Sequence, residues 1–322
     1  MAGVGRVDIE AAVRRIGGRV RETPVLSMLH GLDGIEQALQ FKLEYLQVAG
    51  SFKARGAFNS LLSGCIPAAG VAAASGGNHG VAVAVAARAV GVRATIFVPE
   101  ISAAAKVAAI RDAGAELRIG GATYNDALMA CEAFLTESGA LSVHAYDTVE
   151  TVAGQGTLAW EWDGQMPFAL DTVLVAVGGG GLIGGLATWW GGRGVKVVGV
   201  EPVGSRALHA ALEAGRPVDV SVKSVAADSL GAKRAGALAF EIARRSVADV
   251  VLVEDAAIEE AQQSLWRSLR VAMEPGGAAA WAALLSGAYR PEKHEKIGVL
   301  LCGANVDLGR LADTVKGAGI GR

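Results

Sequence analysis

The stretch TVLVAVGGGGLIGG, residues Thr172–Gly185, predicts a β-strand that turns into a helix through four glycines: Gly178, Gly179, Gly180 and Gly181. The apolar, β-branched residues before the turn favour a buried strand. Glycines leave the backbone N–H groups uncovered, and such groups at a helix N-terminus bind phosphate. One stretch therefore predicts both a βα unit of a parallel sheet and a candidate phosphate site.

The same alternation of short apolar runs and helical patterns extends along the chain at a pitch of roughly 23 residues, which is typical of parallel α/β folds. After an amphipathic helix at Asp8–Arg19, a first block has predicted strands at Val71–Ala74, Ala94–Val98, Glu116–Ile119 and Leu141–His144, with helices at His79–Val90, Ser102–Asp112 and Asn125–Ser138. A second block has predicted strands at Thr172–Val177, Val195–Val200, Asp249–Val253 and Ile297–Leu301, with helices at Leu182–Trp190, Ser205–Ala214 and near 256–271 and 277–286.

These two blocks predict two domains. Residues 1–69 and 148–322 are expected to form a larger domain, into which residues 70–147 are inserted as a smaller α/β domain. A length of 322 residues is sufficient for both cores.

Composition excludes several classes of function. The net charge of −2 gives no electrostatic basis for binding nucleic acid, and no apolar run is long enough to span a membrane. The three cysteines, Cys65, Cys131 and Cys302, have no metal-ligand spacing, so we expect no metal site and a reducing, cytoplasmic environment.

A second motif, SFKARGA at Ser51–Ala57, places Lys53 between Phe52 and small residues. An amine in this setting can lie against a flat ring, although an amphipathic surface segment could carry the same lysine. Pyridoxal phosphate (PLP) requires an amine for a Schiff base and a nest for its phosphate. Lys53 and the glycine turn together supply both.

Two further loops follow predicted strands. Ser75, Gly76, Gly77, Asn78 and His79 open a helix, where free N–H groups can bind a carboxylate. The alternative is an ordinary capped loop with a packed His79. Cys302, after the last strand, could meet a heteroaromatic nitrogen or simply be a buried thiol. Asp228 and Glu274 lie beside glycines and could be caps or site residues.

The glycine turn alone is also compatible with a nicotinamide-dependent oxidoreductase, since Glu201 stands about 20 residues further on, where a ribose partner is expected. That interpretation explains neither Lys53 nor the Asn78 loop. The chain instead resembles the serine/threonine dehydratase family of fold-type II PLP enzymes. The ordered motifs that carry the resemblance are Lys53, the SGGNH loop, the tetraglycine turn, VEP at Val200–Pro202, EPGGAAA from Glu274 and CGAN from Cys302.

The resemblance implies two α/β domains, as in tryptophan synthase β-like enzymes, with PLP in the cleft between them, and often a homodimer. It implies that Lys53 forms the Schiff base, that Phe52 packs on the ring, and that Asn78 meets the phenolic oxygen. Cys302 would face the pyridine nitrogen, and Gly178, Gly179, Gly180 and Gly181 would hold the phosphate. The substrate carboxylate would lie on the loop formed by Ser75, Gly76, Gly77, Asn78 and His79.

A neutral thiol at the pyridine nitrogen makes the ring a weaker electron sink, which favours prompt β-elimination. We therefore expect a lyase that converts a β-hydroxy L-amino acid, such as L-threonine, L-serine, a 3-hydroxyaspartate or phenylserine, into a 2-oxo acid and ammonia. Gly76 replaces the second loop serine of serine racemases, and Glu201 lacks the acidic companion of their cation site. The alternatives are a β-replacement enzyme or synthase, and a non-catalytic PLP-carrying protein that binds amino acids.

Overall fold

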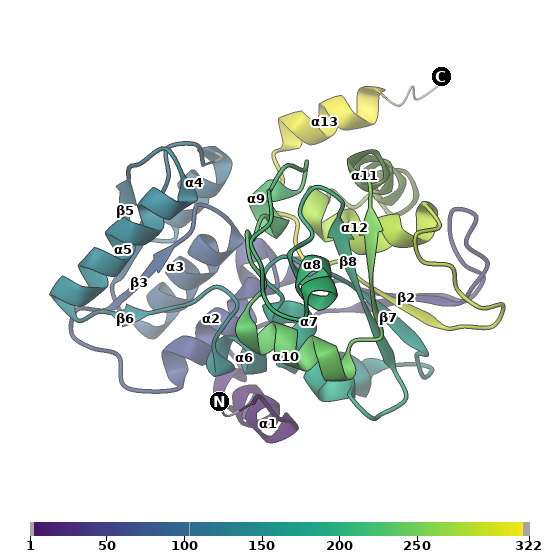
Figure 1. The fold of residues 1–322 in the computed structure, drawn as a ribbon, viewed down its shortest axis with the longest axis horizontal. Coiled ribbons are helices and arrows are strands. Elements are labelled where there is room, and N and C mark those ends of the chain that lie inside the picture. The colour runs from purple at the N-terminus through teal and green to yellow at the C-terminus, as the bar shows by residue number, and fades with distance from the viewer. Residues whose placement is uncertain (1–2, 103, 318–322) are drawn as a thin grey trace.

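Two β-sheets flanked by helices make up the computed structural model, which describes residues 3–102 and 104–317 (Figure 1). The six-stranded sheet has the order β1-β2-β10-β7-β8-β9, and the four-stranded sheet has the order β5-β4-β3-β6. Every paired strand runs parallel to its neighbour except β1, which is antiparallel to β2. The predicted fold class, α/β with mostly parallel sheets, is confirmed.

The strands are β1 (Val25–Met28), β2 (Leu39–Lys42), β3 (Val71–Ala74), β4 (Ala94–Val98), β5 (Glu116–Ile119), β6 (Leu141–Ser142), β7 (Thr172–Ala176), β8 (Lys196–Pro202), β9 (Asp249–Val253) and β10 (Ile297–Leu300). The helices are α1 (Arg6–Ile16), α2 (Lys53–Leu62), α3 (Asn78–Val90), α4 (Ala104–Asp112), α5 (Tyr124–Ser138), α6 (Val149–Gln165), α7 (Gly181–Trp190), α8 (Ala207–Ala214), α9 (Ala227–Leu230), α10 (Ala237–Ser246), α11 (Asp255–Leu269), α12 (Pro275–Leu285) and α13 (Leu308–Gly317), with short 3-10 helices at Glu44–Leu46 and Val48–Gly50. None of the helices described is long and apolar enough to cross a membrane.

Central strands of the larger sheet are buried along their whole length. All residues of β7 and β10 are buried, and α12 packs on β7, β8 and β10. Burial on both faces explains why these strands read as continuous apolar runs rather than as alternating patterns. This sheet holds the ends of β7 and β10, where two of the candidate motifs begin.

The smaller sheet, on the left in Figure 1 with α3, α4 and α5, has its own apolar cluster. That cluster combines Val71 and Ile96 of the sheet with Val83 of α3 and Phe58 of α2. Helix α2 therefore packs against α3 while its first residue, Lys53, lies towards the larger sheet. The division at residues 69/70 and 147/148 stays a prediction.

Several predicted elements differ in length from the structure. The strand expected at Leu141–His144 is only Leu141–Ser142, because His144 turns the chain by accepting hydrogen bonds from two backbone N–H groups that follow it. The first helix ends at Ile16 rather than Arg19, because Gly17 leaves the helical conformation with a ψ of 133° and Gly18 has a φ of +74°. Of the helix predicted at Ser102–Asp112, residue 103 lies outside the described residues, and α4 begins at Ala104.

A buried ion cluster lies beneath α2. Arg55 Nε is 2.7 Å from Glu44 Oε1, and its Nη2 is 2.8 Å from Glu161 Oε2. Lys42 Nζ lies 2.5 Å from Glu161 Oε1. Arg55 is 1% exposed, so its guanidinium depends on these carboxylates for compensation. Although Arg55 belongs to the SFKARGA motif, it anchors α2 rather than reaching the candidate site.

We predict that Arg55→Met lowers the free energy of unfolding by about 3–5 kcal/mol, because it leaves Glu44 buried without its cation. Denaturant unfolding followed by circular dichroism measures this loss. The matched control is Arg206→Met, which breaks an exposed pair with Glu213 and should cost less than about 1 kcal/mol. Equal losses in both variants would contradict the structural role assigned to Arg55.

Candidate active site

The candidate motifs meet where the carboxyl ends of both sheets face each other. The Asn78 loop follows β3, the glycine turn follows β7, and Cys302 follows β10. Backbone contacts join them to the lysine motif: Phe52 N donates to Cys302 O at 3.0 Å, and Ser51 forms an isolated β-bridge with Gly303. Ligands of open α/β sheets bind at such carboxyl edges.

Lys53 is the first residue of α2, and its amine has one hydrogen bond, from Nζ to Ala145 O at 2.8 Å. The amine also lies 5.2 Å from the centroid of the Phe52 ring. Burial lowers the pKa of Lys53 to about 8, and the nearby Cys302 opposes the shift. A sizeable fraction of the amine is therefore neutral near pH 8, as a nucleophile or a base requires.

Cys302 is a buried thiol whose Sγ donates towards Gly276 O at 3.7 Å. Burial, together with the charge of Glu274, raises the pKa of this thiol far above its ordinary value. Cys302 therefore stays uncharged across the physiological range. An uncharged thiol fits the role predicted for Cys302 from the sequence, that of a neutral partner for a pyridine nitrogen.

The glycine turn presents an unfilled set of hydrogen-bond donors. In the described part of the chain, the backbone N–H groups of Gly178, Gly179, Gly180 and Gly181 have no acceptor. Gly180 has a φ of +91°, a conformation that favours glycine, and α7 begins directly after it. Four free donors at a helix N-terminus fit a phosphate group.

Asn78 has its amide orientation set by two neighbours. Its Nδ2 donates to Glu274 Oε1, and its Oδ1 accepts a hydrogen bond from Asn305 Nδ2 at 2.9 Å. Among the described residues, the second N–H of Nδ2 has no acceptor, so it could donate to a ligand oxygen. The predicted role of Asn78 as a cofactor contact therefore fits the chemistry of the donor set.

His79 is packed, as the alternative interpretation proposed. Its Nε2 lies 2.8 Å from Val143 O, and burial followed by the nearby Lys53 lowers its pKa to about 3. The ring is therefore neutral and cannot serve as an acid near neutral pH. In the same loop, Ser75 Oγ accepts from Gly77 N at 3.2 Å, and a Cβ at Gly76 would lie 1.9 Å from Ser102 Oγ. Gly76 thus has a packing reason to be glycine.

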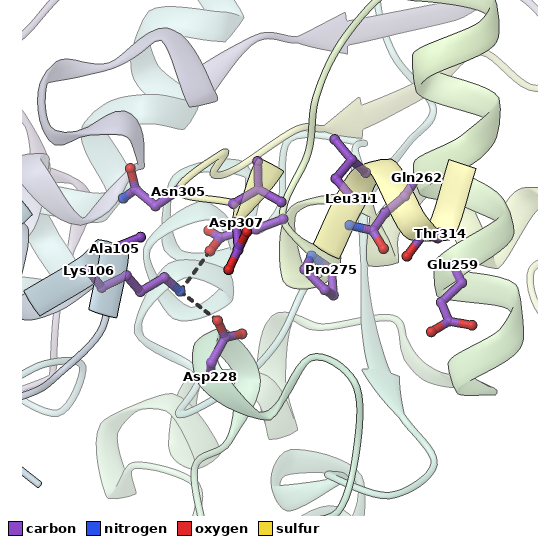
Figure 2. A pocket seen from close by; sticks show the side chains of 12 residues that line it. Ala105, Lys106, Asp228, Glu259, Gln262, Pro275, Asn305, Asp307, Leu311 and Thr314 are labelled. Atoms are coloured by element: carbon purple, nitrogen blue, oxygen red, sulfur yellow. Dashed lines mark hydrogen bonds and ion pairs between the residues drawn. The ribbon is translucent and has the colours of Figure 1, made fainter. Parts of the chain in front are cut away.

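Sequence reasoning missed Lys106, which joins the smaller sheet to the larger one. Lys106 Nζ lies 2.9 Å from Asp228 Oδ2 and 3.1 Å from Glu274 Oε2. Figure 2 shows this amine directed at Asp228, beside Asn305 and the cavity under α13. The one available signal was a lysine in the alanine-rich pattern of residues 103–109, without an acidic residue three or four positions away.

Charges in this cluster depend on one another. Burial would lower the pKa of Lys106, but Glu274 and Asp228 raise it above its ordinary value. Burial raises the pKa of Glu274, and Lys106 opposes that shift. Lys106 Nζ and Asn78 Nδ2 each donate to a different oxygen of Glu274, so this carboxyl group accepts both hydrogen bonds.

Glu201 does not join the site. It is fully buried, and its two oxygens accept hydrogen bonds from the N–H groups of Leu208 and His209 at 2.9 and 2.8 Å. Burial nevertheless raises its pKa to about 8. Because α8 uses both oxygens, Glu201 does not match a ribose partner. Among the described residues, no cluster of three or more His, Cys, Asp and Glu side chains could hold a metal ion.

We predict that the Lys53 amine of the PLP-free protein reacts with an amine-directed acylating reagent at a rate that levels off above about pH 8. An exposed lysine with its ordinary pKa of about 10.4 should keep gaining reactivity beyond that point. Mass spectrometry of peptides, sampled at each pH, measures both rates. A Lys53 profile that follows the exposed lysines would refute the pKa shift.

Comparison with known proteins agrees with this geometry. The family described as pyridoxal-phosphate dependent enzyme matches residues 16–303. The chain is 39% identical over 304 residues to the phenylserine dehydratase of Ralstonia pickettii, covering 91% of this chain and 90% of the relative. It is 36% identical over 312 residues to the L-threonine ammonia-lyase of Geobacter sulfurreducens, covering 96% and 77%. The structure of maize serine racemase matches with a TM-score of 0.90 and 32% identity over 98% of both chains. The predicted resemblance is thereby confirmed, and the chain belongs to the family of pyridoxal-phosphate dependent enzymes.

Proposed function

We propose that this chain is a PLP-dependent lyase that eliminates water from a β-hydroxy L-amino acid, such as L-threonine or L-serine, and releases a 2-oxo acid and ammonia. The observation that carries the proposal is the pairing of Lys53, a lysine with a lowered pKa, with Cys302, a buried neutral thiol. The names of two relatives, a phenylserine dehydratase and an L-threonine ammonia-lyase, support the same reaction class.

Each site residue has a proposed role that matches its surroundings. The bound cofactor would supply an electron sink for the bond that breaks at Cα. Lys53 would hold the cofactor and, once free and neutral, take the Cα proton through Nζ. Phe52 would pack on the ring, Asn78 would donate to its phenolic oxygen, and Cys302 would face its nitrogen. The phosphate would be held by the N–H groups of Gly178, Gly179, Gly180 and Gly181.

The substrate carboxylate would be held by the loop that opens α3, which comprises Ser75, Gly76, Gly77, Asn78 and His79. Neutral donors suffice there, because helix N-terminal N–H groups already favour an anion. His79, neutral and bound to Val143 O, would stiffen the loop rather than move a proton. Gly76 offers no hydroxyl for proton transfer, which argues against racemisation as the main reaction.

Cys302 supports elimination over transamination. A neutral thiol cannot keep a pyridine nitrogen protonated as a carboxylate would, so negative charge at Cα is best removed at once with the β-hydroxyl. A β-replacement enzyme would use the same residues but would need a second, nucleophilic substrate. A PLP-carrying binding protein would hold amino acids without turnover. The substrate panel below distinguishes these alternatives.

We predict that the purified protein shows the visible absorbance band of PLP bound to a lysine and forms 2-oxo acid and ammonia from one member of a panel of L-threonine, L-serine, 3-hydroxyaspartate and phenylserine. In Lys53→Ala, both the band and the product should be lost, since this variant lacks the amine that binds PLP. Product from serine only with an added nucleophile would favour the synthase, and spectral changes without product would favour the binding protein.

We also propose that the chain works as a cytoplasmic homodimer with the domain boundaries predicted above. Support comes from a groove between α1 and α6 in which Trp160 is 43% exposed, next to Val13, Val20 and Trp189. Large exposed aromatic side chains in grooves are typical of protein interfaces. The free thiols Cys65, Cys131 and Cys302 fit a reducing compartment.

Trp160→Glu should convert the dimer into monomers, because it places a charge in this groove. Light scattering coupled to size-exclusion chromatography measures the molecular mass of both proteins. An exposed hydrophobic residue away from α1 and α6, Met129→Glu in α5, is the control and should leave the mass unchanged. A wild-type monomer, or an unchanged mass in Trp160→Glu, would refute this interface.

A further inference from the structure

A single turn of the chain, residues 144–148, contacts both Lys53 and the glycine turn. It leads from β6 of the smaller sheet to α6, and Thr148 caps that helix by accepting from Thr151 N. Its carbonyl at Ala145 accepts the hydrogen bond of Lys53 Nζ at 2.8 Å. The position of the turn therefore helps to set the position of the lysine amine.

The same turn supports the glycine loop from behind. A Cβ at Gly179 would lie 2.4 Å from carbons of the Tyr146 ring, and one at Gly181 would lie 2.7 Å from Tyr146 O. Two of the four glycines are thus required by the close approach of Tyr146. Asp147 continues the contact, since its carboxylate accepts from Ala237 N and Leu238 N, each at 2.9 Å, at the start of α10.

His144 holds this turn in shape. Its Nδ1 accepts hydrogen bonds from Tyr146 N at 3.2 Å and from Asp147 N at 2.9 Å. An imidazole nitrogen that accepts cannot carry a proton, so the ring must be neutral with its proton on Nε2. The ring also meets the edge of Tyr146, with centroids 4.9 Å apart. Neither the SGGNH loop nor the glycine motif contains this histidine, and sequence reasoning did not select it.

We propose that His144 is a positioning residue, which through its unprotonated Nδ1 fixes the turn that places both the Lys53 amine and the phosphate-binding glycine loop. The proposal rests on the cofactor roles proposed above for Lys53 and for Gly178, Gly179, Gly180 and Gly181. The proposal goes beyond those roles. It states that the neutral imidazole of His144, which contacts neither Lys53 nor the glycine turn, sets the distance between these two anchoring points of the cofactor.

A pH dependence follows from this geometry. The charged or titratable groups near His144 are Lys53 from α2, His79 from α3, and Tyr146 and Asp147 from the same turn. Burial lowers the pKa of His144, Lys53 adds to that shift, and Asp147 opposes it. A proton on Nδ1 would point at the backbone N–H groups of Tyr146 and Asp147, which now donate to this nitrogen. Both hydrogen bonds would then be lost, and the turn would open.

The sign of this effect is fixed by linkage. The ordinary pKa of histidine is about 6.5, and His144 is lower in the folded protein. Below pH 6.5 the unfolded chain therefore binds more protons at this site, so stability falls as the pH falls towards the folded-state pKa. Retention of PLP should weaken over the same interval.

The test compares His144→Asn with His144→Leu. Asparagine places an acceptor, Oδ1, near the position of Nδ1, whereas leucine has a similar size and no acceptor. We expect His144→Leu to weaken PLP binding at least about tenfold, because two backbone N–H groups lose their partner. His144→Asn should recover most of that loss and, lacking an imidazole, should also lose the acid-side weakening seen in the wild type.

PLP affinity is measured by titrating the PLP-free proteins and following the absorbance of the lysine-bound cofactor between pH 5 and 8. His294→Leu is the matched control, because His294 is exposed and precedes β10, whereas the site residue Cys302 follows that strand. Equal affinities of His144→Leu and the wild type, or an Asn variant as weak as the Leu variant, would overturn the proposal. If the wild type binds no PLP at all, the proposed function fails together with it.

A second measurement needs no variant and guards against misfolding. Nitrogen-15 NMR of the PLP-free wild-type protein, with labelled histidine, distinguishes a protonated from an unprotonated Nδ1. An unprotonated Nδ1 and a proton on Nε2 at neutral pH support the proposal. A proton on Nδ1 of His144 would overturn it whatever the variants do.

Discussion

The hydrogen bond from Lys53 to Ala145 connects parts of the chain that come from different sheets. Lys53 starts a helix that packs on α3 and α6, and Ala145 lies in the turn that leaves the smaller sheet for α6. The amine therefore sits where both carboxyl edges meet, although its own helix is anchored elsewhere. A small rotation of one sheet relative to the other would move this amine away from the glycine turn, so the site depends on the sheets being held in register.

Two ion clusters supply that register from opposite sides. Arg55, two residues after the lysine, is tied to Glu44 and Glu161 beneath α2. Lys106 reaches from α4 to Asp228 and Glu274. Buried ion pairs are a weak source of net stability, but a partner that shifts out of place leaves a buried charge uncompensated. These ion clusters therefore raise the free energy of other arrangements of the two sheets by more than they lower the free energy of the observed one.

An element of the fold or site could be predicted from the sequence where its cause lies in neighbouring residues, and not where it depends on residues far away in the chain. Strands β3, β4, β5 and β9 were predicted at their observed bounds. For β3 and β4 this is because burial on a parallel sheet leaves a local apolar run, whereas β5 is mostly exposed and was found from its place in the alternation of strands and helices. Helix α2 was not predicted, although its motif was quoted, since it contains a glycine and is anchored by distant carboxylates. The motifs that begin at strand ends could be found for the same local reason.

Lys106 and His144 could not be found in this way. Lys106 acts through partners that lie 122 and 168 positions away in the sequence. His144 acts through hydrogen bonds within a turn that the sequence presented as the end of a strand. Neither has a composition signal, because one lysine or one histidine is compatible with many surroundings. Only the three-dimensional arrangement shows which groups each side chain must satisfy.

Burial makes most of the titratable groups around Lys53 neutral. The Cys302 thiol keeps its proton, His79 cannot gain one, and His144 is held unprotonated by two backbone donors. Positive potential for an anionic ligand must then come mainly from backbone N–H groups, which carry no proton that pH can remove. Such a site can bind a phosphate and a carboxylate while leaving Lys53 as the group whose proton is easiest to move. The lowered pKa of Lys53 and the neutrality of its neighbours are thus two consequences of the same desolvation.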